Sequence, residues 1–149
     1  MMRRQTVPKQ WLIVNGPMNR GTWNALPSLP RGSGVLLLTH LTIRERRDLI
    51  NIAKLRRLSI VADGKAARVH NARELRVALF KRTPLILLSP IYETASHPDW
   101  RPIPRMRAAT LARLGRRKLL ALGGMNDERY AKIARLGFIG WAGISAFRT

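Results

Sequence analysis

Short apolar runs alternate with longer amphipathic stretches along most of this chain. The runs have the length of strands, and in the stretches between them apolar residues recur at the spacing of one helix face. This alternation is typical of βα units, in which parallel strands form one sheet and helices cover it. The pattern predicts strands at residues 11–14, 35–38, 58–61, 85–88, 119–122 and 138–144, and helices at residues 43–57, 72–80, 105–114 and 127–136.

Local signals support some of these elements and weaken others. Thr42 followed by Glu45 forms the sequence of a capping box, which favours a helix start at residue 43. Residues 16–34 contain four glycines and three prolines, and this composition predicts a connection with little helix.

Length and composition indicate a folded domain. The 149 residues suggest one domain spanning residues 1–149, and 46% hydrophobic residues are enough for a buried core. The absence of cysteine excludes disulfides, thiolate metal sites and cysteine nucleophiles. No apolar run approaches the roughly 20 residues of a membrane-spanning helix, and the Met-Met-Arg-Arg start lacks the apolar stretch of a secretory signal. We therefore expect a cytoplasmic protein with no membrane partner.

The net charge is the unusual feature of the composition. The chain has 28 Lys and Arg against 8 Asp and Glu, a formal net charge of +20, which attracts phosphates and nucleic acid. The arginines are dispersed between apolar helical positions, and no nucleic-acid recognition motif accompanies them. This distribution favours solvated helix faces, and a nucleic-acid-associated role stays as the alternative from another functional class.

In parallel α/β folds, the residues that follow the strands form the functional face. The run at 85–88 opens into "SPIYETASHP", residues 89–98, where prolines fix the backbone and Tyr92, Thr94, Ser96 and His97 offer polar groups. Gly123 and Gly124 follow another run and precede a predicted helix, so their N–H groups are placed to approach an anion.

Several segments resemble one known family. "SPIYETASHP", "LALGGM" and "GWAGISAF", in this order, resemble segments of the thiamine-phosphate synthase and thiazole tautomerase family, and "VHNARELRVAL" resembles its Ser-Val-His-Ser-x-Glu-Glu segment. The resemblance is dense over residues 69–147 and thin before them. It implies a (β/α)8 barrel that binds a phosphorylated thiazole and, in the synthase, couples it to a pyrimidine pyrophosphate with magnesium.

The resemblance also implies roles for individual residues. Asp63 matches an aspartate that binds Mg²⁺, although Ala62 replaces the asparagine before it. The remaining matches form a phosphate site at the late strands, where glycine N–H groups, hydroxyls and a helix N-terminus suit a phosphate. Its members are Thr94, Ser96, His97 in place of the family lysine, Gly123, Gly124, Ile144 and Ser145.

His70 matches the proton-transfer histidine of the thiazole tautomerases. A histidine titrating near neutrality suits the movement of a proton around a ring. The family serine two positions earlier is Arg68 here, and a lone histidine without a family match is more often structural than catalytic.

The departures from the family concern the pyrophosphate half of its site. The cations that follow the family's second strand are replaced by Thr39 and His40, and only six residues separate Asp63 from His70, where the family has a further βα unit.

We therefore predict a TIM-barrel-related (β/α) barrel lacking one βα unit, with Asp63, His70, Thr94, Ser96, Gly123 and Ser145 around one mouth. The predicted function is in thiamine biosynthesis, as a thiamine-phosphate synthase-like protein that binds a thiazole phosphate and couples it to the pyrimidine slowly or not at all; the alternatives are a thiazole tautomerase and an inactive paralogue.

Overall fold

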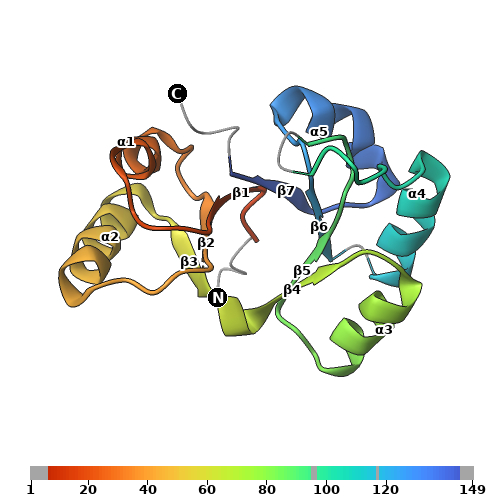
Figure 1. The fold of residues 1–149 in the computed structure, drawn as a ribbon, viewed down its shortest axis with the longest axis horizontal. Helices are drawn as coiled ribbons and strands as arrows, with labels where there is room; N and C mark the ends of the chain where they lie inside the picture. Colours follow the sequence, from red (N-terminus) through yellow and green to blue (C-terminus); the bar gives the residue numbers. More distant parts are fainter. Residues whose placement is uncertain (1–6, 95–96, 117, 145–149) are drawn as a thin grey trace, which may run out of the picture.

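A computed structural model of the chain describes residues 7–94, 97–116 and 118–144. Within these residues, seven parallel strands form one curled sheet, in the order β3-β2-β1-β7-β6-β5-β4, with helices on its outer face (Figure 1). The strands are β1 (Gln10–Val14), β2 (Gly34–Leu37), β3 (Ser59–Ala62), β4 (Ala66–Val69), β5 (Leu85–Leu88), β6 (Leu119–Leu122) and β7 (Gly140–Gly143). The helices are α1 (Arg20–Ser28), α2 (Ile43–Arg56), α3 (Ala72–Phe80), α4 (Arg105–Leu114) and α5 (Asp127–Ile133), with 3-10 turns η1 (Asp63–Lys65) and η2 (Ala134–Leu136).

The first and last strands of the sequence pair at the middle of the sheet. β1 lies parallel to β7, with Trp11 opposite Ala142, and parallel to β2 on its other side, with Trp11 opposite Gly34. This pairing joins the two halves of the molecule in the way that a closed (β/α) barrel joins its first and last strands. The result is a TIM-barrel-related half-barrel, which confirms the predicted fold class.

The sheet ends at β3 and β4, which do not pair with one another. Only the three-residue turn η1 separates them along the chain, where a complete barrel has a helix and a further strand. Because η1 is so short and both strands run in the same direction, the carboxyl end of β3 lies at the amino end of β4. The carboxyl ends of all seven strands therefore do not lie at the same height along the barrel.

Alternation along the strands divides the core into an interior layer and two outer layers. Trp11 and Ile13 of β1 point into the curled sheet with Leu87 of β5, whereas Leu12 and Val14 pack outward. One outer layer lies under α1 and α2, and the other lies under α3, α4 and α5. A Cβ at Gly34 would collide with the Trp11 ring, so a glycine at this position allows the indole to fill the interior.

Two elements differ from the sequence-based prediction. Helix α1 forms inside the glycine- and proline-rich stretch because Asn19 caps it, accepting a hydrogen bond from the Thr22 N–H, and Pro27 stands only at its end. Strand β4, with the sequence Ala-Ala-Arg-Val, has no apolar run, since it is an edge strand that leaves Arg68 exposed. The last predicted strand is shorter than expected, and the other predicted elements lie within a residue or a few of their observed bounds.

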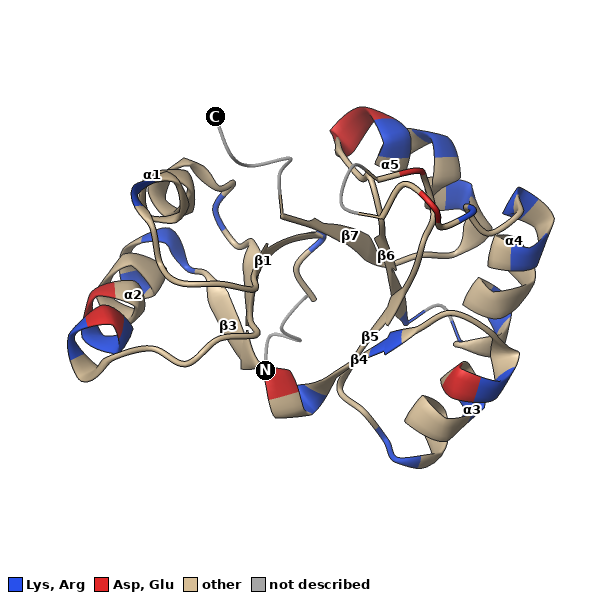
Figure 2. Cartoon of the chain, in the orientation of Figure 1, with Lys and Arg blue, Asp and Glu red and all other residues tan. Residues whose placement is uncertain are grey.

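The basic residues lie mainly on the outer helices, as the dispersed pattern predicted (Figure 2). The arginines that the structure describes are exposed, apart from Arg56 and Arg129, which are half-buried. Within the same residues only two ion pairs form, His70–Glu74 and Lys132–Glu128, so most of the positive charge has no carboxylate partner. None of the described helices is both long and apolar enough to cross a membrane.

Candidate functional site

Four neighbouring strands bring most of the predicted site residues to one end of the sheet. His70 follows β4, Thr94 and His97 follow β5, Gly123 and Gly124 follow β6, and Ile144 follows β7. These strands are adjacent in the sheet, so their carboxyl ends lie side by side (Figure 1). Ser96 and Ser145, also predicted for this site, lie outside the described residues.

Gly123 and Gly124 form a tight turn, which we call the glycine turn. Both have positive φ angles, 109° and 59°, a region that glycine occupies without strain. A Cβ at Gly124 would lie 2.5 Å from the Glu93 carbonyl oxygen, so the turn and the loop after β5 are in close contact. Neither glycine N–H donates a hydrogen bond within the described part of the chain. The turn thus offers two unpaired donors at the carboxyl end of β6.

Arg129 places a positive charge beside the glycine turn. Its side chain donates a hydrogen bond through Nη1 to the Gly124 carbonyl, and its guanidinium lies 4.8 Å from the centre of the Tyr92 ring. Its backbone N–H donates to the side chain of Asn126, which caps α5. Sequence analysis missed this residue; its position in the first turn of the helix after two glycines is the signal that identifies it.

The loop after β5 is held by its own polar side chains. The Thr94 hydroxyl oxygen accepts a hydrogen bond of 3.0 Å from the His97 N–H. The His97 ring stacks on the Trp100 ring, with 3.8 Å between ring centres and 6° between the planes. His97, which stands where the family has lysine, therefore contacts an aromatic ring, and Trp100 joins the residues that sequence analysis missed.

His70 is oriented by Glu74, one turn into α3. The carboxylate oxygen Oε2 lies 3.0 Å from His70 Nδ1 and accepts a second hydrogen bond from the His70 backbone N–H. The hydrogen bond from the His70 side chain is the main cause that lowers the pKa of Glu74 below its ordinary value. The His70 ring also contacts Trp100 edge to face, with 5.8 Å between ring centres. These contacts fix the ring and leave it partly exposed.

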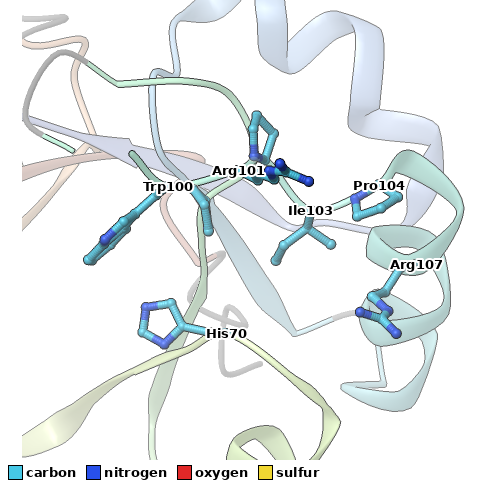
Figure 3. A pocket seen from close by; sticks show the side chains of 8 residues that line it. His70, Trp100, Arg101, Ile103, Pro104 and Arg107 are labelled. Carbon is cyan, nitrogen blue, oxygen red and sulfur yellow. The ribbon is translucent and has the colours of Figure 1, made fainter. Parts of the chain in front are cut away.

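A cavity of about 540 Å³, which we call the α4 cavity, opens next to His70 (Figure 3). His70 lines it from the β4–α3 side, and Arg107 lines it from α4, with Trp100, Arg101 and Ile103 of the connecting loop between them. Arg101 and Arg107 were not among the predicted site residues. Of the predicted site residues that the structure describes, His70 alone lines this cavity.

Asp63 lies apart from the other predicted residues. It is exposed in η1, before β4, whereas His70 follows β4, so a strand length of about 13 Å separates the two positions. The expected single mouth therefore holds the residues after β4 to β7 without Asp63. Among the described residues no group of three His, Asp or Glu side chains is arranged to hold a metal ion.

Comparisons with known proteins identify a fold neighbour. No protein-family model and no curated protein sequence matches this chain. The solved structure of a thiamine phosphate pyrophosphorylase from Pyrococcus furiosus matches it with a TM-score of 0.70 and 14% sequence identity, over 95% of this chain and 88% of that chain. A likeness at this identity shows the fold, and the curled parallel sheet with its outer helices is shared by the two proteins.

Proposed function

We propose that this protein acts in thiamine biosynthesis, as a thiamine-phosphate synthase-like protein that binds a phosphorylated thiazole at the carboxyl ends of β5 to β7. One observation carries the proposal: the two unpaired N–H groups of the glycine turn stand beside the Arg129 guanidinium. Backbone N–H donors with an adjacent cation at a helix start are the usual means of binding a phosphate in such folds. The fold neighbour, named a thiamine phosphate pyrophosphorylase, supports the choice of a thiazole phosphate.

His70 is the residue that we assign to proton transfer on the bound ring. Its β4 position is two strand spacings from β6, about 10 Å, which is the separation that a ligand with its phosphate at the glycine turn and its ring at the imidazole has to span. Glu74 accepts a hydrogen bond from Nδ1, which leaves Nε2 to take a proton from one ring position and return it to another. This arrangement favours the thiazole tautomerase among the two enzyme activities of the family.

Coupling to a pyrimidine pyrophosphate is the weaker part of the proposal. Mg²⁺ in such reactions is held by one or two carboxylates together with substrate phosphates, and would neutralise the charge of the leaving pyrophosphate. Asp63 offers a single exposed carboxylate with Lys65 two residues away, and Thr39 and His40 replace the family's cations. The described residues therefore fit the ion poorly, and we expect coupling to be slow.

Calorimetric titration with the thiazole phosphate tests the proposal. We expect binding to the unaltered protein and at least about tenfold weaker binding to Arg129→Met, since a charge-assisted contact contributes about 1.5–3 kcal/mol. Arg135→Met removes the same charge from an exposed position in η2 and serves as the matched control.

The possible results separate the parts of the proposal. No binding to the unaltered protein, or equal losses in both variants, contradicts the phosphate site. Binding without isomerisation of the ring contradicts the role of His70 alone. Rapid thiamine-phosphate formation with pyrimidine pyrophosphate and Mg²⁺, lost in Asp63→Ala, contradicts the expectation of slow coupling.

A further inference from the structure

The α4 cavity contains arginines that the proposed thiazole phosphate site does not use, Arg101 and Arg107, beside His70. It lies between the starts of α3 and α4, on the His70 side of the loop that connects β5 to α4 (Figure 3). The glycine turn and Arg129 do not line it. A volume of about 540 Å³ is within the range of sites that bind small molecules or single nucleotide units.

Two arginines, Arg101 and Arg107, line the cavity. Within the residues that the structure describes, the side chains of Arg101 and Arg107 make neither a hydrogen bond nor an ion pair. Arg73 adds a third exposed cation, in the first turn of α3 and three residues after His70. An anion at the cavity would neutralise charges that otherwise repel one another.

Arg107 is directed to this cavity by the geometry of α4. Arg105, two residues earlier, donates a hydrogen bond through Nη2 to the Lys132 carbonyl and so turns toward α5. Arg107 lies on the other side of the helix, where it lines the cavity with His70. The first turn of α4 contains no acidic residue, so no carboxylate in that turn offsets these arginines.

Trp100 gives the rim of the cavity an aromatic surface. Trp100 is 45% exposed although the His97 ring stacks on it, so part of the indole is accessible to a planar ligand. Exposed tryptophan beside arginines is the combination that binds single strands, because bases stack on the ring and the cations contact the phosphates.

The charge of the whole chain decides which phosphate-bearing partner fits best. A small phosphate needs two or three cations, whereas this chain has a net charge of +20 with few ion pairs among the described residues, and further basic residues lie along α3 and α4 (Figure 2). A long polyanion gains from this field along its length.

We propose that the α4 cavity binds one nucleotide unit of a single-stranded nucleic acid, with a backbone phosphate between Arg101 and Arg107 and a base against Trp100. The strand runs on over the basic outer faces of α3 and α4. This site shares His70 with the proposed thiazole site and uses none of the residues that we assign to the thiazole phosphate.

Fluorescence anisotropy with a labelled single-stranded DNA oligonucleotide, measured over a series of salt concentrations, tests this proposal. The variant Arg101→Gln/Arg107→Gln is expected to bind at least about tenfold more weakly at low salt, and the slope of log affinity against log salt is expected to fall by about 0.7, the value for one phosphate contact on a single strand. Arg44→Gln/Arg47→Gln on α2 removes the same charge from exposed positions and is expected to change the affinity much less. Trp100→Ala is expected to weaken binding at least about fivefold, and Trp100→Phe to retain most of it.

Several results would overturn the proposal. Equal losses in the two double variants would mean that net charge alone attracts the strand. A duplex that competes as well as the single strand, or no binding at physiological salt, would exclude a single-strand site. Loss of thiazole phosphate binding in Arg101→Gln/Arg107→Gln, with DNA binding unchanged, would assign these arginines to the small ligand.

Discussion

The two halves of the sheet differ in the segments at the carboxyl ends of their strands. In the half that contains β4 to β7, His70, Thr94 and the glycine turn follow neighbouring strands, at the carboxyl ends of β4, β5 and β6. In the half that contains β1 to β3, β2 ends near Thr39 and His40, and β3 continues through η1 directly into β4. Both halves contribute to the interior layer, with Trp11, Leu36, Leu87 and Leu120 packed together.

This difference separates the residues that maintain the fold from those available for chemistry. Loss of one βα unit at the β3–β4 junction leaves the β1–β7 pairing and the shared interior in place. It leaves the half that contains β1 to β3 without a loop after β3 that could carry further polar groups. A substitution after β4 to β7 should therefore change ligand binding or catalysis, and the equivalent change after β1 to β3 should not.

The largest expected effect is on proton transfer. Replacement of His70 by alanine should lower the tautomerisation rate about 10²- to 10⁴-fold, the usual contribution of a general acid–base group. His40→Ala, which removes an exposed histidine after β2, should leave the rate unchanged. The rate of ring isomerisation measures both, and equal rates in the two variants would contradict the division between the halves.

The shared interior predicts similar losses of stability in the two halves. Leu36→Ala in β2 and Leu87→Ala in β5 each remove a fully buried side chain from the same layer, so each should lower the free energy of unfolding by about 2–5 kcal/mol. Urea unfolding followed by circular dichroism should show one transition in each variant. A second transition in Leu36→Ala alone would show that the halves unfold separately.

A comparison of two glycines gives the next largest effect. Gly124→Ala forces a side chain into a positive-φ turn against the Glu93 carbonyl, which should cost about 1–3 kcal/mol of stability and weaken thiazole phosphate binding. Gly16→Ala, after β1, meets no atom within 4 Å and should change neither quantity. Thermal denaturation with and without the thiazole phosphate measures both effects, and a Gly124→Ala protein with unaltered ligand stabilisation would contradict the role of the turn.

The smallest effect concerns the pH dependence of stability. Because the pKa of Glu74 is lowered from an ordinary value of 4.5, its contribution is present above that value and is lost as the pH falls through the lowered pKa. The His70–Glu74 pair is exposed, so its contribution to the free energy of unfolding should be at most about 0.5 kcal/mol. Urea midpoints of the unaltered protein and Glu74→Gln should differ near neutral pH, and the difference should shrink as the pH falls below 4.5; a constant difference would exclude ionisation of Glu74 as the cause.

Much of the fold is predictable from the sequence because burial of one face of each helix and strand imposes a regular spacing on its apolar residues. The strands at 85–88 and 119–122 and the helices at 72–80 and 105–114 were predicted with the observed bounds. Strand β4 was not predicted, because Ala66, Ala67 and Arg68 lie at an edge that tolerates small and charged residues. Helix α1 was not predicted because its cap at Asn19 outweighs the glycines and prolines around it.

The candidate site was predictable where the backbone conformation constrains the residue type. The glycines at 123 and 124 are needed by positive φ angles and close packing, so the motif is visible in the sequence. Arg101, Arg107 and Arg129 could not be distinguished in the sequence from the other arginines of the chain. Only the fold places these three beside a cavity or a turn.

The most direct test of the central claim is an NMR titration of glycine-labelled protein with the thiazole phosphate. Amide ¹H–¹⁵N resonances report on the N–H groups that we assign to the phosphate. We predict that the resonances of Gly123 and Gly124 shift and saturate with the ligand, while those of Gly16 and Gly34 in the other half stay in place. Saturation of the protein with ligand while Gly123 and Gly124 remain unshifted would contradict the account.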